Sequence, residues 1–233
     1  MIPNLRKRAS EAEIMDDFSL PAHEVVPVLK GLEKMNALFG GHNTLIKALK
    51  KIPLKGGDHL SDWGCGGGDA LRAIAQWANK TGLQVQLTGV DATPSAVAFA
   101  RERASAYPNI NFILSDVMAP ALLTNQFDIV FSSLFSHHFK DDEWVALVKK
   151  MLACSKKAVI ITDLHRHWVL YYAVWAIAHI FTKSKMARFD GPLSVRRSFK
   201  KTELVKLLSR AGLTNYEISW KWAFRWQLIV YKS

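Results

Sequence analysis

The sequence predicts a doubly wound α/β fold: a Rossmann-like sheet of seven strands, mostly parallel, with a C-terminal antiparallel hairpin and additional N-terminal helices. From residue 56 onward, short apolar runs alternate with helical stretches, a pattern that favours a parallel sheet covered on both faces by right-handed crossovers. A glycine-rich turn at 64–68 separates the first such run from the first helical stretch. The last two apolar runs lie too close together for a helical crossover, so they should pair as a hairpin.

The expected elements follow from periodicity and from stop signals. Apolar residues at helical spacing before Gly40 and Gly41 predict a helix at 21–39, followed by a shorter one at 43–51. Runs rich in β-branched and apolar residues predict strands at 59–63, 83–91, 110–114, 127–132, 158–163, 216–220 and 224–231. Helical stretches between them predict helices at 70–79, 94–107, 144–153 and 201–211, the last ended by Gly212.

The 233 residues suit one domain, and no repeat or linker divides them. We expect a single domain over 1–233. Within it, 1–55 would form a loose polar arm and helices, 56–163 a ligand-binding core, 164–199 a cap, and 200–233 the closing helix and hairpin.

The charge of the chain is unevenly distributed. The net charge is +11, and residues 161–233 hold thirteen Lys and Arg against four Asp and Glu, so nine of the eleven excess charges lie there. This bias favours an anionic partner such as a nucleic acid, a lipid surface or an acidic substrate, although a basic surface without a partner would look the same. Only two cysteines occur and no apolar leader follows the basic start. We therefore expect reduced thiols and a cytoplasmic location, with peripheral contact to the inner face of an anionic membrane as a further option.

The glycine-rich turn is the most informative motif. Glycines let the backbone pass close beneath a ligand, and the helix that follows adds a favourable field at its N-terminus. Gly-x-Gly-x-Gly alone is a weak signal, but Asp62 precedes it, and its spacing differs from the G-x-G-x-x-G of dinucleotide enzymes. Asp91 ends the next expected strand, where it could bind ribose hydroxyls, and Asp116 follows the third.

Together with the Phe-Asp-Ile-Val strand at 127–130, these motifs resemble class I S-adenosylmethionine-dependent methyltransferases over 60–163. The resemblance implies S-adenosylmethionine as cofactor and S-adenosylhomocysteine as product. It implies that the glycine turn holds the methionine portion, Asp91 the ribose, and Asp116 with Val117 the adenine edge. The cofactor-binding residues so implied are Asp62, Gly64, Gly66, Gly68, Asp91, Ala92, Asp116, Val117 and Ser132. A relative of the fold that has lost its ligand is the alternative.

Two adjacent histidines, His137 and His138, follow the fourth expected strand, at the edge where such sheets bind substrates. A phenol acceptor, with a pKa near ~10, benefits from a general base, whereas a carboxylate acceptor needs none. Because consecutive residues on a turn diverge, we expect only one ring to point inward, and we favour His138 over His137 as the base. The alternative is that both rings cap or pack the loop.

Asp163, His165 and His167 gather after the fifth strand and raise the question of a metal. The ligand spacing of structural zinc sites is absent, and so is the magnesium pattern of catechol enzymes. We therefore expect no metal.

Residues 168–181 contain no charge, and basic residues flank them on both sides. The stretch is shorter than the roughly 20 residues that span a bilayer. Because it is apolar on nearly every face, it should form a core helix, cover an apolar pocket or touch a membrane surface.

Four further motifs resemble bacterial methyltransferases associated with type III polyketide synthases, which implies O-methylation of phenolic lipids. They are the Glu-Ile-Met-Asp-Asp run at 13–17, the His-His-Phe turn at 137–139, and the stretches 163–166 and 190–199. His167 and Trp168 stand where that group often has a small residue, which puts the shape of the pocket in doubt. The expected substrate-binding residues are Met15, His165, Arg166, Trp168, Arg196 and Arg197. Arg196 and Arg197 could hold an acidic or phenolate oxygen, or simply be solvated.

Two other functions stay open from the sequence alone. An RNA methyltransferase would account for the charge, but the Asn-Pro-Pro-Tyr-like motif of amino methyltransferases is missing after 127–132, and no RNA-binding module is apparent, so nucleic acid is not the expected partner. A membrane-surface protein that keeps the fold without catalysis is the other. The sequence leaves the oligomeric state undetermined.

Overall fold

The computed structural model describes residues 3–119 and 126–232, and its centre is a seven-stranded sheet. The strand order is β3-β2-β1-β4-β5-β7-β6; β1 to β5 pair in parallel, and β7 pairs antiparallel with both β5 and β6. The strands are β1 (His59–Trp63), β2 (Gln86–Asp91), β3 (Ile110–Leu114), β4 (Phe127–Ser133), β5 (Ser155–Leu164), β6 (Tyr216–Lys221) and β7 (Arg225–Tyr231). The predicted fold class, including the closing hairpin, is confirmed.

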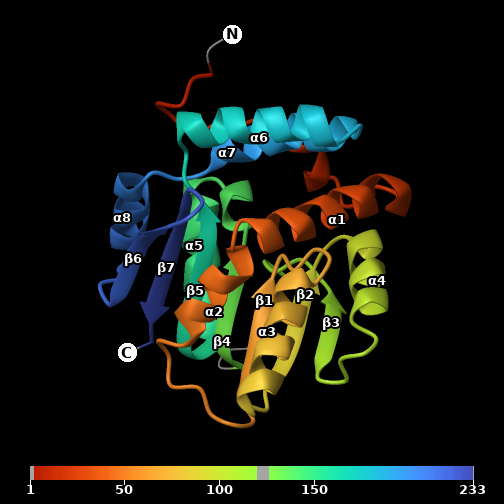
Figure 1. Cartoon of the computed structure of the whole chain (residues 1–233). Coiled ribbons are helices and arrows are strands. Elements are labelled where there is room, and N and C mark those ends of the chain that lie inside the picture. The colour runs from red at the N-terminus through yellow and green to blue at the C-terminus, as the bar shows by residue number, and fades with distance from the viewer. Residues whose placement is uncertain (1–2, 120–125, 233) are drawn as a thin grey trace.

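Helices cover both faces of this sheet (Figure 1). The helices are α1 (Ala22–Leu38), α2 (Gly41–Leu49), α3 (Asp69–Thr81), α4 (Pro94–Arg103), α5 (Asp141–Cys154), α6 (Trp168–Phe181), α7 (Lys185–Arg197) and α8 (Lys201–Arg210), with short 3-10 helices η1 (Ile14–Asp16) and η2 (Ser136–His138). One core lies under α2, α3 and α4, and the other under α5 and α8. Strand residues alternate between them, as Leu60 and Trp63 of β1 do, because successive side chains in a strand point to opposite faces.

The N-terminal arm is held in place, so the expectation of a loose arm is wrong for its described part. Arg8 donates through its guanidinium to the carbonyl oxygens of His137, Phe139 and Arg197. Ala9 adds a backbone hydrogen bond to the carbonyl of Arg196. The arm is therefore tied both to the turn after β4 and to α7. Residues 1 and 2 of the expected arm lie outside the described residues.

Helix α7 was not predicted, because Gly191 and Pro192 lie inside it and both disfavour helix interiors. Tertiary contacts override that propensity: the Asp190 carboxylate of α7 accepts from the backbone N–H groups of Ile14 and Met15 in the arm. The helix begins after Ser184, whose hydroxyl caps it by accepting from the Ala187 N–H.

Helix α6 has the predicted bounds but not the buried position of a core helix. Of its fourteen residues only Leu170 and Ala178 are buried. In Figure 1 it is the outermost layer, lying over α7 on the side of the molecule away from the sheet. The core-helix interpretation of 168–181 is therefore wrong. None of the described helices is long and apolar enough to cross a membrane.

Candidate active site

The glycine loop lies at the edge where the parallel strands end, between β1 and α3. Gly64, Gly66 and Gly68 have φ angles of 72°, 48° and 68°, a left-handed region that other residues adopt at a cost. A Cβ on Gly64 would lie 2.1 Å from the ring of Phe135, so no side chain fits there. The loop therefore needs glycine at Gly64 both for its backbone conformation and for the close approach of the turn after β4.

Asp91 at the end of β2 fastens this loop. Its Oδ2 accepts from the Gly66 N–H at 2.8 Å, and its Oδ1 accepts from the Thr93 N–H at 2.9 Å. A carboxylate oxygen can accept a second hydrogen bond in addition to the one that each oxygen of Asp91 already accepts. Asp91 thus positions the glycine loop and keeps acceptor capacity for a ligand hydroxyl.

Two buried polar groups at the same edge have unused acceptor capacity. Asp62 is 2% exposed and its Oδ1 has no hydrogen-bond partner among the described residues; the same is true of the Ser132 hydroxyl at the end of β4. Burial, followed by the charges of Asp69 and Asp91, raises the pKa of Asp62 well above its ordinary value. A buried carboxylate two residues before the glycine loop suits a ligand that carries an ammonium group, as the methionine portion of S-adenosylmethionine does. The residues present therefore fit this cofactor.

The remaining cofactor candidates lie at the same edge. Ala92 follows β2 directly, and Asp116 and Val117 follow β3. The Ser115 N–H donates to the carbonyl of Asp91 at 2.9 Å, which holds the two strand ends together. Asp116 is exposed and Val117 is buried, so an acceptor and an apolar surface lie next to each other.

The histidines of η2 form the second half of the site. His137 is 2% exposed, and its Nδ1 lies 2.7 Å from Oδ1 of Asp163 at the end of β5. Burial alone would raise the pKa of Asp163, but the charge and hydrogen bond of His137, with a further bond from Ser136, outweigh it and hold the pKa lowered to about 2. Asp163 therefore fixes the orientation of the His137 ring and leaves its Nε2 pointing away.

His138 has the same arrangement with a different carboxylate. Its Nδ1 lies 2.6 Å from Oδ1 of Asp16 on the arm, and Asp16 also pairs with Arg197 at 2.7 Å. Burial would raise the pKa of Asp16, but the hydrogen bonds and charges of His138 and Arg197 outweigh it and lower the pKa. The two imidazole rings stack with their centroids 4.5 Å apart. The expectation that the rings diverge is therefore wrong. Asp163 holds the ring of His137 and Asp16 holds the ring of His138, and the two rings are oriented in the same direction.

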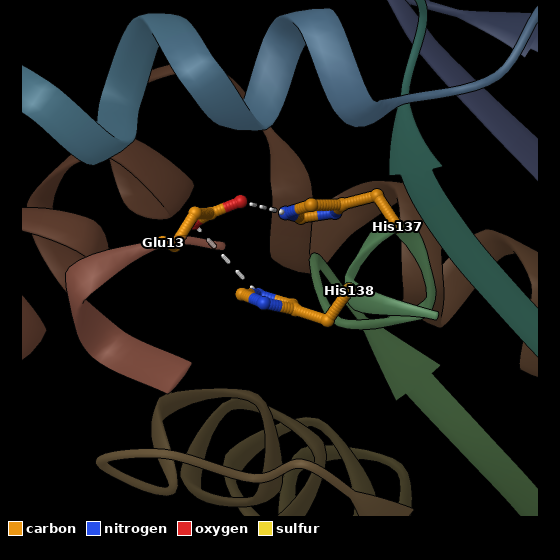
Figure 2. A group of neighbouring side chains, drawn as sticks. All are labelled: Glu13, His137 and His138. Carbon is orange, nitrogen blue, oxygen red and sulfur yellow. Dashed lines mark ion pairs between the residues drawn. The ribbon is translucent and has the colours of Figure 1, made fainter. Parts of the chain in front are cut away.

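Both rings point toward Glu13 of the arm, as Figure 2 shows. Nε2 of His137 lies 3.6 Å from Oε1 of Glu13, and Nε2 of His138 lies 4.0 Å from Oε2. Glu13 is 6% exposed, and burial is the main cause that raises its pKa to about 7. The Ser194 hydroxyl of α7 donates to Oε2 at 2.8 Å. The Glu13 carboxyl group can thus take up and release a proton near neutral pH.

Sequence reasoning did not pair Glu13 or Asp16 with the histidines, and it did not pair Asp163 with His137. The arm and the η2 turn are more than 120 residues apart in the chain. The available signal was the combination of acidic residues in the arm with two adjacent histidines that lacked partners in the sequence around them.

A metal could also be held here. Ligand atoms of Glu13, His137 and His138 all lie within 4.8 Å of one another. The expectation of no metal was argued from a different set, Asp163, His165 and His167, and it stays a prediction. In the structure Asp163 bonds to His137, and the rings of His165 and His167 have centroids 5.4 Å apart. Arg197 already places a cation 3.6 Å from Glu13 Oε1.

The structure brings some of the expected substrate residues to this cluster. Arg197 contacts it directly, and Met15 lies one residue before Asp16, packed beside Leu29 and Phe99 in a small core between α1 and α4. Others have different surroundings. Arg166 donates to the Ser198 carbonyl and pairs with Glu203, and Arg196 pairs with Glu11 at 2.8 Å. The His165 ring lies tilted against Trp226, and Trp168 is 61% exposed. The substrate roles of all six stay predictions.

Residues 61–158, less than half of the chain, match a family model described as a methyltransferase domain. The matched segment contains the glycine loop, Asp62, Asp91, Asp116 and both histidines, whereas Glu13 and Asp16 lie outside it.

A trans-aconitate 2-methyltransferase from Escherichia coli O157:H7 is 32% identical over 73 residues, which are 31% of this chain and 26% of that protein. The match thus spans about a quarter of the curated relative. A methyltransferase from Aquifex aeolicus that depends on S-adenosylmethionine has the same fold, with a TM-score of 0.65 over 89% of this chain and 98% of that one, at 16% identity. The plantazolicin methyltransferase, solved with S-adenosylhomocysteine, gives a TM-score of 0.67 over 93% and 92%, also at 16% identity. The match to the methyltransferase family model over 61–158 and the shared fold support a class I methyltransferase with S-adenosylmethionine as cofactor.

Proposed function

We propose that this chain transfers a methyl group from S-adenosylmethionine to a hydroxyl oxygen of a hydrophobic, phenolic or lipid-like small molecule. The observation that carries the proposal is the pair of carboxylate–histidine contacts beside the glycine loop, Asp163 with His137 and Asp16 with His138. A hydroxyl acceptor requires removal of its proton, and these contacts supply a positioned base.

His138 is the base in this proposal. With its Nδ1 proton donated to Asp16, its Nε2 is free to accept the proton of the acceptor hydroxyl. His138 is partly exposed, whereas His137 is almost fully buried, so His138 is the ring that an acceptor can reach. When bound, the cofactor supplies an electrophilic methyl on a sulfonium; the oxygen takes the methyl, and the electrons of the broken C–S bond leave with the sulfur as a neutral thioether. The Asp16 carboxylate stabilises the imidazolium that forms on His138.

The cap region supports an apolar acceptor. A cavity of about 510 Å³ lies between α6 and α7. Its lining residues include Tyr171, Trp175, His179, Phe189 and Leu193, together with Arg188, Arg196 and the Glu11 carboxylate that pairs with Arg196. Aromatic walls with a few cationic groups suit an aromatic or acyl group that carries oxygen substituents.

The exposed face of α6 supports peripheral contact with an anionic membrane, where a lipid-like acceptor would be found. Trp168, Tyr172 and Trp175 are exposed at helical spacing, and Ile180 and Phe181 extend the face. Lys183 and Lys185 follow and are exposed. Aromatic residues with adjacent cations are typical of helices that lie in the interface of a bilayer. Binding to vesicles that contain phosphatidylglycerol but not to pure phosphatidylcholine vesicles, lost on changing Trp175 and Phe181 to serine, would test this contact.

A second candidate is methylation of a small carboxylic acid. The similarity to a trans-aconitate 2-methyltransferase over 73 residues favours it. A carboxylate acceptor needs no base, so this activity would survive replacement of His138.

The experiment that tests the function measures transfer of a labelled methyl group from S-adenosylmethionine. The acceptors are a long-chain alkylresorcinol, trans-aconitate and RNA, each with the wild type and with His138→Ala. Transfer to the alkylresorcinol that is lost in the variant supports the proposal. Transfer to trans-aconitate or RNA alone would replace the proposed acceptor class, and no transfer together with no binding of S-adenosylhomocysteine would refute the enzymatic function.

A further inference from the structure

The guanidinium of Arg225, the first residue of β7, is buried without a carboxylate partner. The residue is 4% exposed. One nitrogen, Nη2, donates to the Asn36 side-chain oxygen at 3.0 Å, while Nε and Nη1 have no hydrogen-bond partner among the described residues. Within those residues no carboxylate lies in ion-pair distance of it. A buried cation without an anion is costly, so such a group usually has a partner.

Asn36 links this guanidinium to the start of α3, and the Arg225 backbone lies beside the end of β5. Asn36, its one partner, donates to Oδ2 of Asp69 at 2.9 Å, and Asp69 opens α3 directly after Gly68. On its other side Arg225 pairs in register with Leu164, the residue after Asp163. Arg225 therefore lies at the carboxyl edge of the sheet, one hydrogen-bonded residue away from the Asp69 that follows the glycine loop.

The glycine at position 41 leaves room for the Arg225 side chain. A Cβ on Gly41, the first residue of α2, would lie 2.9 Å from Nη1 of Arg225 and 2.7 Å from Oδ1 of Asn36. Gly41 does not have a positive φ angle, so the contact and not the backbone conformation explains the glycine. The end of α1, the start of α2 and the start of β7 together form a cradle around one guanidinium.

We propose that Arg225 binds the carboxylate of the methionine portion of S-adenosylmethionine. This assignment rests on the proposed function and deepens it. The unpartnered N–H groups of this guanidinium can donate to the oxygens of a carboxylate. Asp62, with its unpartnered oxygen, would take the ammonium group of the same amino-acid portion, so that each charged end of that portion meets a buried opposite charge.

The charge of Arg225 persists in the fold. Burial lowers its pKa, and the charges of Asp163 and Asp69 act in the opposite direction. An arginine pKa is far above neutral to begin with, so the guanidinium stays protonated.

Two ligands that differ in the amino-acid portion test the assignment by calorimetry. S-adenosylhomocysteine has the carboxylate, and 5′-methylthioadenosine lacks it while keeping the adenosine and the sulfur. We expect Arg225→Gln to weaken S-adenosylhomocysteine binding by about 10- to 100-fold, the range of a charge-assisted pair, and to leave 5′-methylthioadenosine binding unchanged. Arg210→Gln, which removes an exposed arginine paired with Asp142, is the matched control and should change neither affinity.

Gly41→Ala provides a second variant that keeps the charge but displaces the guanidinium, and it should weaken only S-adenosylhomocysteine as well. Equal losses for both ligands, or no loss for either, in folded Arg225→Gln and Gly41→Ala proteins would overturn the assignment while leaving the proposed function intact. If the wild type binds neither ligand, the proposed function fails, and the assignment fails with it.

Discussion

Nε2 of His137 lies 3.6 Å from Oε1 of Glu13, and neither atom has a hydrogen-bond partner among the described residues. The contact joins the N-terminal arm to the turn after β4.

Replacing Glu13 with glutamine should change how stability depends on pH. The folded-state pKa of Glu13 is raised from its ordinary 4.5 to about 7. The folded state thus holds the proton more tightly, and the stability gained from it is complete below pH 4.5 and lost as the pH rises through 7. Glu13→Gln should remove that loss, which is on the order of 3 kcal/mol between pH 4.5 and 8. Urea unfolding at several pH values measures it, with the exposed Glu11→Gln as control; parallel curves for wild type and Glu13→Gln would contradict the raised pKa.

The two histidines should respond differently to alanine. His138→Ala should lower kcat by about 10²- to 10⁴-fold while S-adenosylhomocysteine affinity is kept, because a general base is lost and the glycine loop is untouched. His137→Ala should instead cost about 3–5 kcal/mol of stability, because it leaves the Asp163 charge buried without its partner. Thermal unfolding and steady-state kinetics separate the two effects. An unchanged kcat in His138→Ala would exclude it as the base.

Asp91→Ala should weaken cofactor binding by about 1–3 kcal/mol through lost charge-assisted hydrogen bonds. The variant also frees the N–H groups of Gly66 and Thr93, so the loop itself loses support. Calorimetric titration with S-adenosylhomocysteine measures the effect. Asp128→Ala is the control, because Asp128 lies at the opposite end of the strands, where it accepts from the His59 N–H. The affinity of this variant for S-adenosylhomocysteine should match that of the wild type.

Gly64→Ala should be far more damaging than Gly82→Ala. Both glycines have positive φ angles, 72° and 70°, which cost alanine about 1 kcal/mol. At Gly82 nothing lies within 4 Å of an added Cβ, whereas at Gly64 the Phe135 ring is 2.1 Å away. Thermal unfolding should show a small loss for Gly82→Ala, and Gly64→Ala should lose several-fold more stability and its cofactor binding. Similar losses in both would show that the Phe135 contact is unimportant.

Chelation should leave methyl transfer intact. The Arg197 guanidinium lies 3.6 Å from Oε1 of Glu13, so a cation already stands beside the carboxylate of this cluster and disfavours a metal ion there. Activity measured before and after dialysis against EDTA, with metal analysis of the protein, checks this. Activity that falls and returns with added Zn²⁺ or Mn²⁺ would identify Glu13, His137 and His138 as ligands instead.

The fold could be predicted because its signals are local. Strands such as β1 and β3 have the predicted bounds, and the glycine loop is defined by a few consecutive residues. Helix α7 was missed because its stability comes from contacts with the arm that outweigh Gly191 and Pro192. The exposure of α6 could not be predicted, because an apolar composition does not show what, if anything, covers a helix.

The site could be predicted only where neighbours in sequence are neighbours in space. The pairing of Glu13 and Asp16 with the histidines, and the position of Arg225 beside Asn36, join residues separated by more than a hundred positions. Nothing in a local pattern encodes such contacts, whereas the position of Asp91 after its strand follows directly from the topology of a parallel sheet.

The arm that supplies Glu13 and Asp16 also has consequences for how activity appears during folding. Asp16 pairs with Arg197 near the other end of the chain, so the catalytic cluster contains some of the contacts of longest sequence separation in the molecule. Such contacts are slow to form, because loop closure must be completed before they contribute. A ribosome-bound chain that has been synthesised only through β5 contains His138 and Asp16 but lacks Arg197, so Asp16 would have its histidine partner without its arginine partner.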